Sequence, residues 1–216
     1  MNDGKIRDVI HLLKKAMREL PFVSRLAKEH RGPFPILVST ILSLRTKDEV
    51  SAAATERLFA LASTPEEMLK FSEEEIIRAI YPVGFYRNKA GSILHICREL
   101  IDRFNSQVPD TVDELLSLKG VGRKTANLVL SLGYRKDGIC VDTHVHRISN
   151  RLGYVRTKTP EQTEYALREK LPIEYWSLYN TLMVVFGRNI CRPISPLCGI
   201  CPVSSHCDKV GVTRSR

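Results

Sequence analysis

The spacing of apolar residues is the feature of this 216-residue sequence that most restricts its fold. Apolar side chains recur at intervals of three and four residues, which is the pattern of amphipathic α-helices. Such stripes run over residues 6–20, 36–44, 76–80, 93–101 and 128–132. No alternating run of useful length indicates a half-buried strand. The sequence therefore predicts an all-α chain of about nine or ten helices joined by short loops.

Helix starts are marked by hydroxyl residues with a carboxylate three positions later, a combination typical of helix N-termini. Such pairs occur at Thr64, Ser72 and Thr111. Pro21 is expected to limit the first helix. A polar turn at residues 133–138 is the expected domain boundary.

Positive charge is concentrated in one part of the chain. The sequence has 33 lysines and arginines against 24 aspartates and glutamates, a formal net charge of +9. Nine basic but only two acidic residues fall between Lys119 and Lys158, so this segment carries most of the excess. A phosphate backbone is its natural partner, because neutralising phosphates releases condensed counterions. The sequence therefore predicts a nucleic-acid partner.

Signals of secretion and membrane insertion are lacking. The N-terminal segment has no uninterrupted apolar core of a signal peptide, and the longest apolar stretch, residues 34–44, is too short to span a bilayer. No lipidation signal or long basic amphipathic helix favours a membrane surface. We therefore expect an intracellular protein without a membrane partner, cytoplasmic and associated with the nucleoid if the host is prokaryotic.

Two glycines in the segment 118–126 predict a binding site for a phosphate oxygen. Gly120 and Gly122 separate an apolar segment from a second helix, expected at residues 127–132. Glycine permits positive φ angles that leave N–H groups pointing outward, which suits an anion. An ordinary turn between two helices is the alternative. The neighbouring Arg123 and Lys124 favour nucleic acid.

Lys124 and Asp142 are the candidates for catalysis. Lys124 falls in the first turn of the predicted helix, where the helix dipole and nearby cations should disfavour its protonated form. A neutral lysine amine can attack carbon and form a Schiff base. Asp142 precedes Thr-His-Val-His and is predicted to be a helix N-cap. The alternatives are that Lys124 only contacts phosphate and that Asp142 only caps a helix. As a catalytic pair, Lys124 would supply a nucleophile and Asp142 a charge-stabilising carboxylate.

Four of the six cysteines crowd into the last 26 residues in the pattern C-x6-C-x2-C-x5-C. They are Cys191, Cys198, Cys201 and Cys207. We expect these thiolates to share one ion or cluster, because a reduced compartment does not maintain disulfides. Tetrahedral zinc is an alternative to an iron–sulfur cluster, although zinc sites usually pair cysteines two to four residues apart. Cys97 and Cys140 lie in apolar runs and are predicted to be core residues.

Together these motifs resemble the endonuclease III family of DNA glycosylases, within the helix-hairpin-helix and Gly/Pro-Asp superfamily. The resemblance extends from about residue 30 to Cys207. The matching stretches are residues 42–48, 81–89, 120–126, 141–145 and 186–188, together with the four clustered cysteines.

The resemblance implies an all-α fold of two helical lobes with DNA in the cleft between them. Residues 27–136 would form a six-helix bundle domain with a helix-hairpin-helix motif at about residues 115–134. Residues 1–26 and 137–216 would form the iron–sulfur cluster domain, with one 4Fe-4S cluster on the four cysteines. A monomer is expected, because one pair of lobes already encloses the DNA.

The resemblance also implies base excision DNA repair. Similar proteins flip an oxidised pyrimidine out of damaged double-stranded DNA, cleave its N-glycosidic bond and nick the abasic site by β-elimination. By position, Lys124 would attack the sugar C1′ and form the Schiff base, while Asp142 would stabilise the sugar cation and accept a proton. The implied DNA-binding residues are Arg45, Phe85, Lys119, Gly120, Val121, Gly122, Arg123 and His144.

Several departures from the family pattern limit this transfer. Lys119 replaces a common proline, and Arg45 stands where glutamine commonly fills the gap left by the flipped base, so the opposite-base preference is not fixed. Phe85 matches an apolar wedge position, with a core aromatic as the alternative. Two other functions stay open: a mismatch thymine or uracil glycosylase of the same superfamily, and a non-catalytic DNA-binding module with a structural metal.

Overall fold

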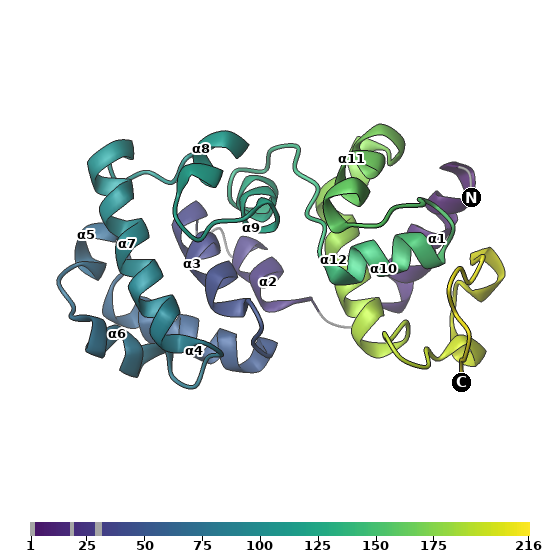
Figure 1. The fold of residues 1–216 in the computed structure, drawn as a ribbon, viewed down its shortest axis with the longest axis horizontal. Helices are drawn as coiled ribbons and strands as arrows, with labels where there is room; N and C mark the ends of the chain where they lie inside the picture. The colour runs from purple at the N-terminus through teal and green to yellow at the C-terminus, as the bar shows by residue number, and fades with distance from the viewer. Residues whose placement is uncertain (1–2, 18–19, 29–31) are drawn as a thin grey trace. The chain divides into compact units, whose positions relative to one another are not determined.

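The computed structural model describes residues 3–17, 20–28 and 32–216. Within these ranges the chain forms twelve α-helices and four shorter helical turns, and no β-strand (Figure 1). The predicted all-α class is confirmed, but the helices outnumber the nine or ten expected. The short helices α5, Pro65–Met68, and α8, Val112–Ser117, hold too few apolar positions to show a periodicity, and only their capping residues indicate them in the sequence. No described helix is long and apolar enough to cross a membrane.

Contacts divide the chain into two compact units. Met1–Pro21 with Asp137–Arg216 forms the first unit, and Phe22–Lys136 forms the second. The predicted boundary between residues 26 and 27 cuts through α2, Phe22–Lys28, and is wrong for this helix. α2 packs on α3 and α4, so it belongs as a whole to the second unit.

The second unit is built around α3, Pro33–Ser43, which is buried along nearly its whole length. It contacts α2, α4, α7, α9 and the π-helical turn η1, Val129–Gly133. Each fully buried Leu or Ile in such a core contributes about 1.5–3 kcal/mol. The other helices of this unit are α4, Asp48–Leu61; α6, Glu73–Ile80; α7, Tyr86–Phe104; and α9, Arg123–Leu128.

All three predicted N-caps are confirmed. The side chains of Thr64, Ser72 and Thr111 each accept a hydrogen bond from a backbone N–H in the first turn of α5, α6 and α8. At Ser72 the carboxylate of Glu75 also accepts from the Ser72 N–H at 2.8 Å, completing a capping box. Each cap contributes about 1 kcal/mol, which fixes where these short helices begin.

The helix expected at residues 127–132 differs from the prediction. It begins earlier, at Arg123, and its last turn is π-helical over η1, Val129–Gly133. There the N–H of Tyr134 donates to the carbonyl of Val129 at 3.2 Å, five residues back. Periodicity alone does not distinguish this wider turn from an α-helical one.

The first unit joins the N-terminal helix to the C-terminal part of the chain. α1, Asp3–Ala16, packs on α12, Trp176–Asn189, which also contacts α10, Thr143–Arg151. α11, Pro160–Lys170, packs on α10, and three 3-10 turns follow at Ile173–Tyr175, Cys198–Ile200 and Ser204–His206. The α1 stripe ends at Ala16, so Met17 and Leu20 lie outside the helix, while residues 18–19 fall outside the described part. Pro21 disfavours a helical conformation at Leu20.

Candidate active site and metal centre

The turn between α8 and α9 presents backbone on the surface. Gly120 has φ 92°, the left-handed conformation that glycine allows, whereas Gly122 is extended at φ −98°. A Cβ at Gly122 would meet no atom within 4 Å, so this glycine leaves open space beside the chain rather than supplying the expected positive φ. Val121 is buried between them and anchors the turn. The N–H of Lys119 donates to Glu99 Oε2 at 3.1 Å, tying the turn to α7.

Lys124 follows this turn directly. It is the second residue of α9 and so lies in the first turn of the helix, as predicted. Its side chain is half-buried, as is that of Arg123. Lys119, Gly120 and Gly122 are exposed. The structure therefore gathers an amine, two further cations and an exposed backbone turn within six residues of the second unit.

Asp142 caps α10 in the first unit. Its Oδ1 accepts hydrogen bonds from the N–H groups of His144 at 2.8 Å and Val145 at 2.9 Å, so the predicted N-cap is confirmed. The side chain is half-buried. Two N–H donors hold the carboxylate in one orientation, which is the preorganisation that a charge-stabilising group needs.

The ring of His144 packs against α12. Arg147 Nη2 lies 3.2 Å from His144 Nδ1 and donates to the carbonyls of Gly187, at 3.3 Å, and Cys191, at 2.9 Å. Arg147 is a functional candidate that the sequence reasoning missed. The signal was its position three residues after His144, on the same helix face.

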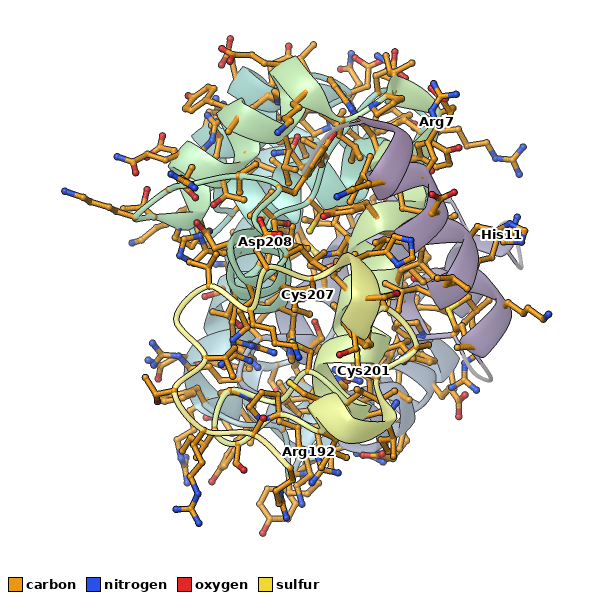
Figure 2. All side chains as sticks on the ribbon, turned by 90° about the vertical axis from the view of Figure 1, so that its right-hand side faces the viewer. Arg7, His11, Arg192, Cys201, Cys207 and Asp208 are labelled. Atoms are coloured by element: carbon orange, nitrogen blue, oxygen red, sulfur yellow. The ribbon has the colours of Figure 1, made fainter. Side chains whose placement is uncertain are left out.

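The four clustered cysteines line one small pocket, together with Ile148, Phe186 and Val203. Figure 2 shows Cys201 and Cys207 on the C-terminal segment of the chain. Burial raises the pKa of the Cys201 and Cys207 thiols. A bound metal would reverse this effect, because a coordinating thiol is deprotonated.

The chemistry of the four donors fits a polynuclear group, because cysteine thiolates are the ligands that hold iron–sulfur clusters. A tetrahedral zinc would take the same four sulfurs at about 2.3 Å from one point. Among the described residues, no three His, Cys, Asp or Glu side chains are arranged to hold one metal ion. Arg151 Nη1 and the Lys209 N–H donate to Cys191 Sγ and Cys207 Sγ at 3.5 and 3.4 Å, contacts that tune cluster thiolates.

Arg45 and Phe85 form an exposed pair on the second unit. The Arg45 guanidinium carbon lies 5.6 Å from the centroid of the Phe85 ring. Phe85 is 60% exposed, which excludes the alternative that it is a core aromatic. Cys97 and Cys140, in contrast, are buried core residues as predicted.

The predicted site residues thus fall into two groups. Lys124, the hairpin, Arg45 and Phe85 belong to the second unit, whereas Asp142, His144 and the four cysteines belong to the first. Each group is locally ordered by the contacts described above.

Comparison with known proteins agrees with this geometry. Residues 38–173 match the family described as HhH-GPD superfamily base excision DNA repair protein, and residues 191–207 match the iron-sulfur binding domain of endonuclease III. The chain is 47% identical to endonuclease III of Thermotoga maritima, covering 91% of this chain and 92% of that one. It is 44% identical to endonuclease III homolog 2 of Arabidopsis thaliana, covering 83% of this chain but 48% of that longer protein.

A solved structure of a trapped endonuclease III–DNA covalent intermediate superimposes with a TM-score of 0.83 at 34% identity, covering 97% of both chains. The hairpin, the two helical units and the cysteine segment together define the class of this protein. It is a helix-hairpin-helix DNA glycosylase of base excision DNA repair, with abasic-site lyase activity and a 4Fe-4S cluster. More specifically, the chain belongs to the endonuclease III family.

Proposed function

We propose that this enzyme acts on damaged double-stranded DNA, removing oxidised pyrimidines and nicking the abasic site through a Schiff base on Lys124. The observation that carries the proposal is the half-buried Lys124 directly after an exposed glycine turn. A half-buried amine beside a phosphate-binding turn is positioned to reach a sugar carbon while the DNA backbone is held. The related protein trapped covalently on DNA supports the same chemistry.

In the proposed reaction, the Lys124 amine attacks C1′ as the bond from C1′ to the base breaks. The carboxylate of Asp142 stabilises the positive charge on the sugar and accepts the proton that the attacking nitrogen loses, and the departing base takes up a proton. The C1′–O4′ bond then breaks, O4′ takes up a proton, and the imine forms between C1′ and the lysine nitrogen. Loss of a C2′ proton from this imine then expels the 3′ phosphate. Water hydrolyses the imine and restores Lys124.

The backbone N–H groups of Gly120, Val121 and Gly122 would bind a phosphate, with Lys119 and Arg123 adding charge. His144 would add a DNA contact from the first unit. Arg45 and Phe85 would occupy the gap that the flipped nucleotide leaves, since both are exposed.

The two units would then serve as the two lobes of the enzyme. In this proposal Phe22–Lys136 binds DNA through the hairpin, and the remaining residues carry the cluster and Asp142. A monomer suffices, because one chain supplies both lobes. Association with chromosomal DNA in the cytoplasm of a prokaryotic host follows from the same activity.

Borohydride trapping on duplex DNA with an abasic site tests the proposal. The wild-type enzyme should give a covalent adduct, and Lys124→Gln should abolish it while retaining DNA binding. Lys119→Gln is the matched control, because it removes a neighbouring exposed cation and should weaken binding without abolishing the adduct. Absence of an adduct with the wild type, or its survival in Lys124→Gln, would refute the lyase role of Lys124.

A mismatch thymine or uracil glycosylase is the second candidate, because Arg45 stands where relatives commonly have the glutamine that fills the gap left by the flipped base, so the opposite-base preference is not fixed. Excision should be measured on one panel of duplexes containing thymine glycol, dihydrouracil, uracil opposite guanine and thymine opposite guanine. Faster excision of the oxidised pyrimidines supports the proposal. A preference for the two mismatches would replace it with the second candidate.

A further inference from the structure

Lys89 is a buried ammonium group in the second unit, only 7% exposed. Its Nζ donates to three oxygens: the carbonyls of Leu42 at 2.9 Å and Leu44 at 2.6 Å, and Oγ1 of Thr46 at 3.1 Å. Burying an ammonium costs several kcal/mol unless its hydrogens are satisfied. The Lys89 ammonium has three N–H donors, and each can be satisfied by one of these three oxygens.

The three acceptors lie on both sides of Arg45. Leu42 is in the last turn of α3, and Leu44 and Thr46 flank Arg45 directly. Lys89 itself stands in the first turn of α7, where its N–H donates to the carbonyl of Phe85 at 3.0 Å. One side chain therefore ties the segment that carries Arg45 to the helix that begins after Phe85.

Other contacts join the same two segments. The N–H of Gly84 donates to Thr46 Oγ1 at 3.2 Å, and a Cβ at Gly84 would lie 2.6 Å from the carbonyl oxygen of Arg45. The backbone of Arg45 therefore lies so close to Gly84 that a residue with a Cβ atom would not fit at position 84. Arg45 and Phe85 both have left-handed backbones, with φ 51° and 59°. Such conformations cost about 1–3 kcal/mol each and persist only where surrounding contacts fix them.

We propose that Lys89 is a positioning residue that locks the turns of Arg45 and Phe85 into one rigid wedge, which holds DNA open at the flipped nucleotide. The proposal rests on the function proposed above for Arg45 and Phe85. Lys89 does not touch DNA in this scheme. It acts through the two exposed side chains whose backbones it fixes.

Burial also lowers the pKa of Lys89 to about 8, which agrees with an ammonium group withdrawn from water. A lysine that only filled core space would be replaced at less cost by an apolar side chain of similar length. A cation that only stabilised the carbonyl end of α3 is the competing interpretation. It predicts lower stability without a specific defect in base flipping.

The test compares Lys89→Met with the wild type in single-turnover assays. On a duplex with an oxidised pyrimidine opposite 2-aminopurine, the variant should lose at least about tenfold in excision rate and should show less fluorescence from the unstacked opposite base. On a preformed abasic site, where no base has to be flipped, borohydride trapping should fall less than about threefold. Equal losses on both substrates, or none on either, would overturn the proposal.

A double-mutant cycle separates positioning from general stability. The cycle compares the effect of Lys89→Met in the wild type with its effect in a protein that already carries Arg45→Ala and Phe85→Ala. If Lys89 acts through the wedge, the substitution should cause little further loss of excision in the second protein. If the roles are independent, the fold-losses in excision rate should multiply.

Should Lys89→Met fold poorly, Thr46→Val removes the shared acceptor while keeping the shape of the side chain. It should produce a smaller defect of the same kind, and an unchanged excision rate would contradict the proposal. A wild type without excision on any substrate would instead refute the proposed function.

Discussion

A Cβ atom at Gly187 would lie 2.3 Å from Nδ1 of His144, so α12 and the start of α10 pack more closely than any larger residue at position 187 permits. The same atom would lie 2.9 Å from Nη2 of Arg147. The glycine in the Phe186-Gly-Arg188 motif is therefore required for its size. Its buried backbone supports the ring of a proposed DNA-binding residue.

Gly187→Ala should displace His144 and Arg147 and weaken DNA binding. Overpacking of this kind costs about 1–3 kcal/mol, even though alanine otherwise favours a helix over glycine. Thermal unfolding and DNA titrations at several salt concentrations measure the two effects. Gly91→Ala is the matched control in α7, since its Cβ would stand 3.4 Å from Glu73 Oε1, an ordinary contact. A Gly187→Ala protein with wild-type stability and affinity would contradict the packing argument.

Asp142→Asn should separate the capping role of this residue from its proposed catalytic role. Asparagine is as good an N-cap as aspartate, so the melting temperature should change little. Removing the negative charge should lower the excision rate by about 100-fold or more at saturating enzyme, because the charge acts in the transition state. Asp142→Ala, by comparison, should also lose about 1 kcal/mol of stability with the cap. Excision near the wild-type rate in Asp142→Asn would leave Asp142 a structural cap only.

Local patterns predicted those parts of the molecule that depend on neighbouring residues in the chain. The caps at Thr64, Ser72 and Asp142 follow from hydrogen bonds that span three residues, and the structure contains each of them. Burial of Cys97 and Cys140 followed from their apolar surroundings in the sequence.

Contacts between distant segments were not predictable in this way. Lys89 reads in the sequence as an ordinary charged residue near a helix start, and only the fold brings the carbonyls of Leu42 and Leu44 onto its ammonium group. Arg147 was missed for the same reason, because its acceptors at Gly187 and Cys191 are 40 and 44 residues away. The positive φ predicted for Gly122 was wrong, because its backbone is extended. The sequence alone does not show whether a glycine in a turn is needed for a left-handed backbone or for the space that a missing side chain leaves.

The purified enzyme should contain about four irons and four sulfides per chain and absorb broadly in the visible range. Cys201→Ser should lose iron and destabilise the first unit, because the pocket walls then face one another without the group that fills it. Cys140→Ala is the control, since this buried cysteine does not line the pocket and should leave the iron content unchanged. Iron and sulfide analysis of protein purified without oxygen decides the matter, and one zinc per chain would show that the cysteines hold a different metal.

The pKa of Lys89 predicts a dependence of stability on pH. Burial lowers this pKa to about 8 from 10.5, and all three acceptors around Nζ are uncharged oxygens. Between these values the unfolded chain binds a proton that the folded chain has released, so this group makes the free energy of unfolding rise with pH. The rise should begin near pH 8, be complete near pH 10.5 and amount to roughly 3 kcal/mol at most.

Urea unfolding at a series of pH values from 7 to about 10.5 measures this contribution as the difference between the wild type and Lys89→Met. Taking the difference cancels the other lysines and tyrosines that titrate in the same range. The free energy of unfolding of the wild type minus that of Lys89→Met should increase as the pH rises above 8, because the variant has no proton to release at this position. A constant difference would mean that Lys89 has the same pKa in the folded and the unfolded chain, because both would then release the proton together. A falling difference would mean that these hydrogen bonds raise the pKa above that of an exposed lysine.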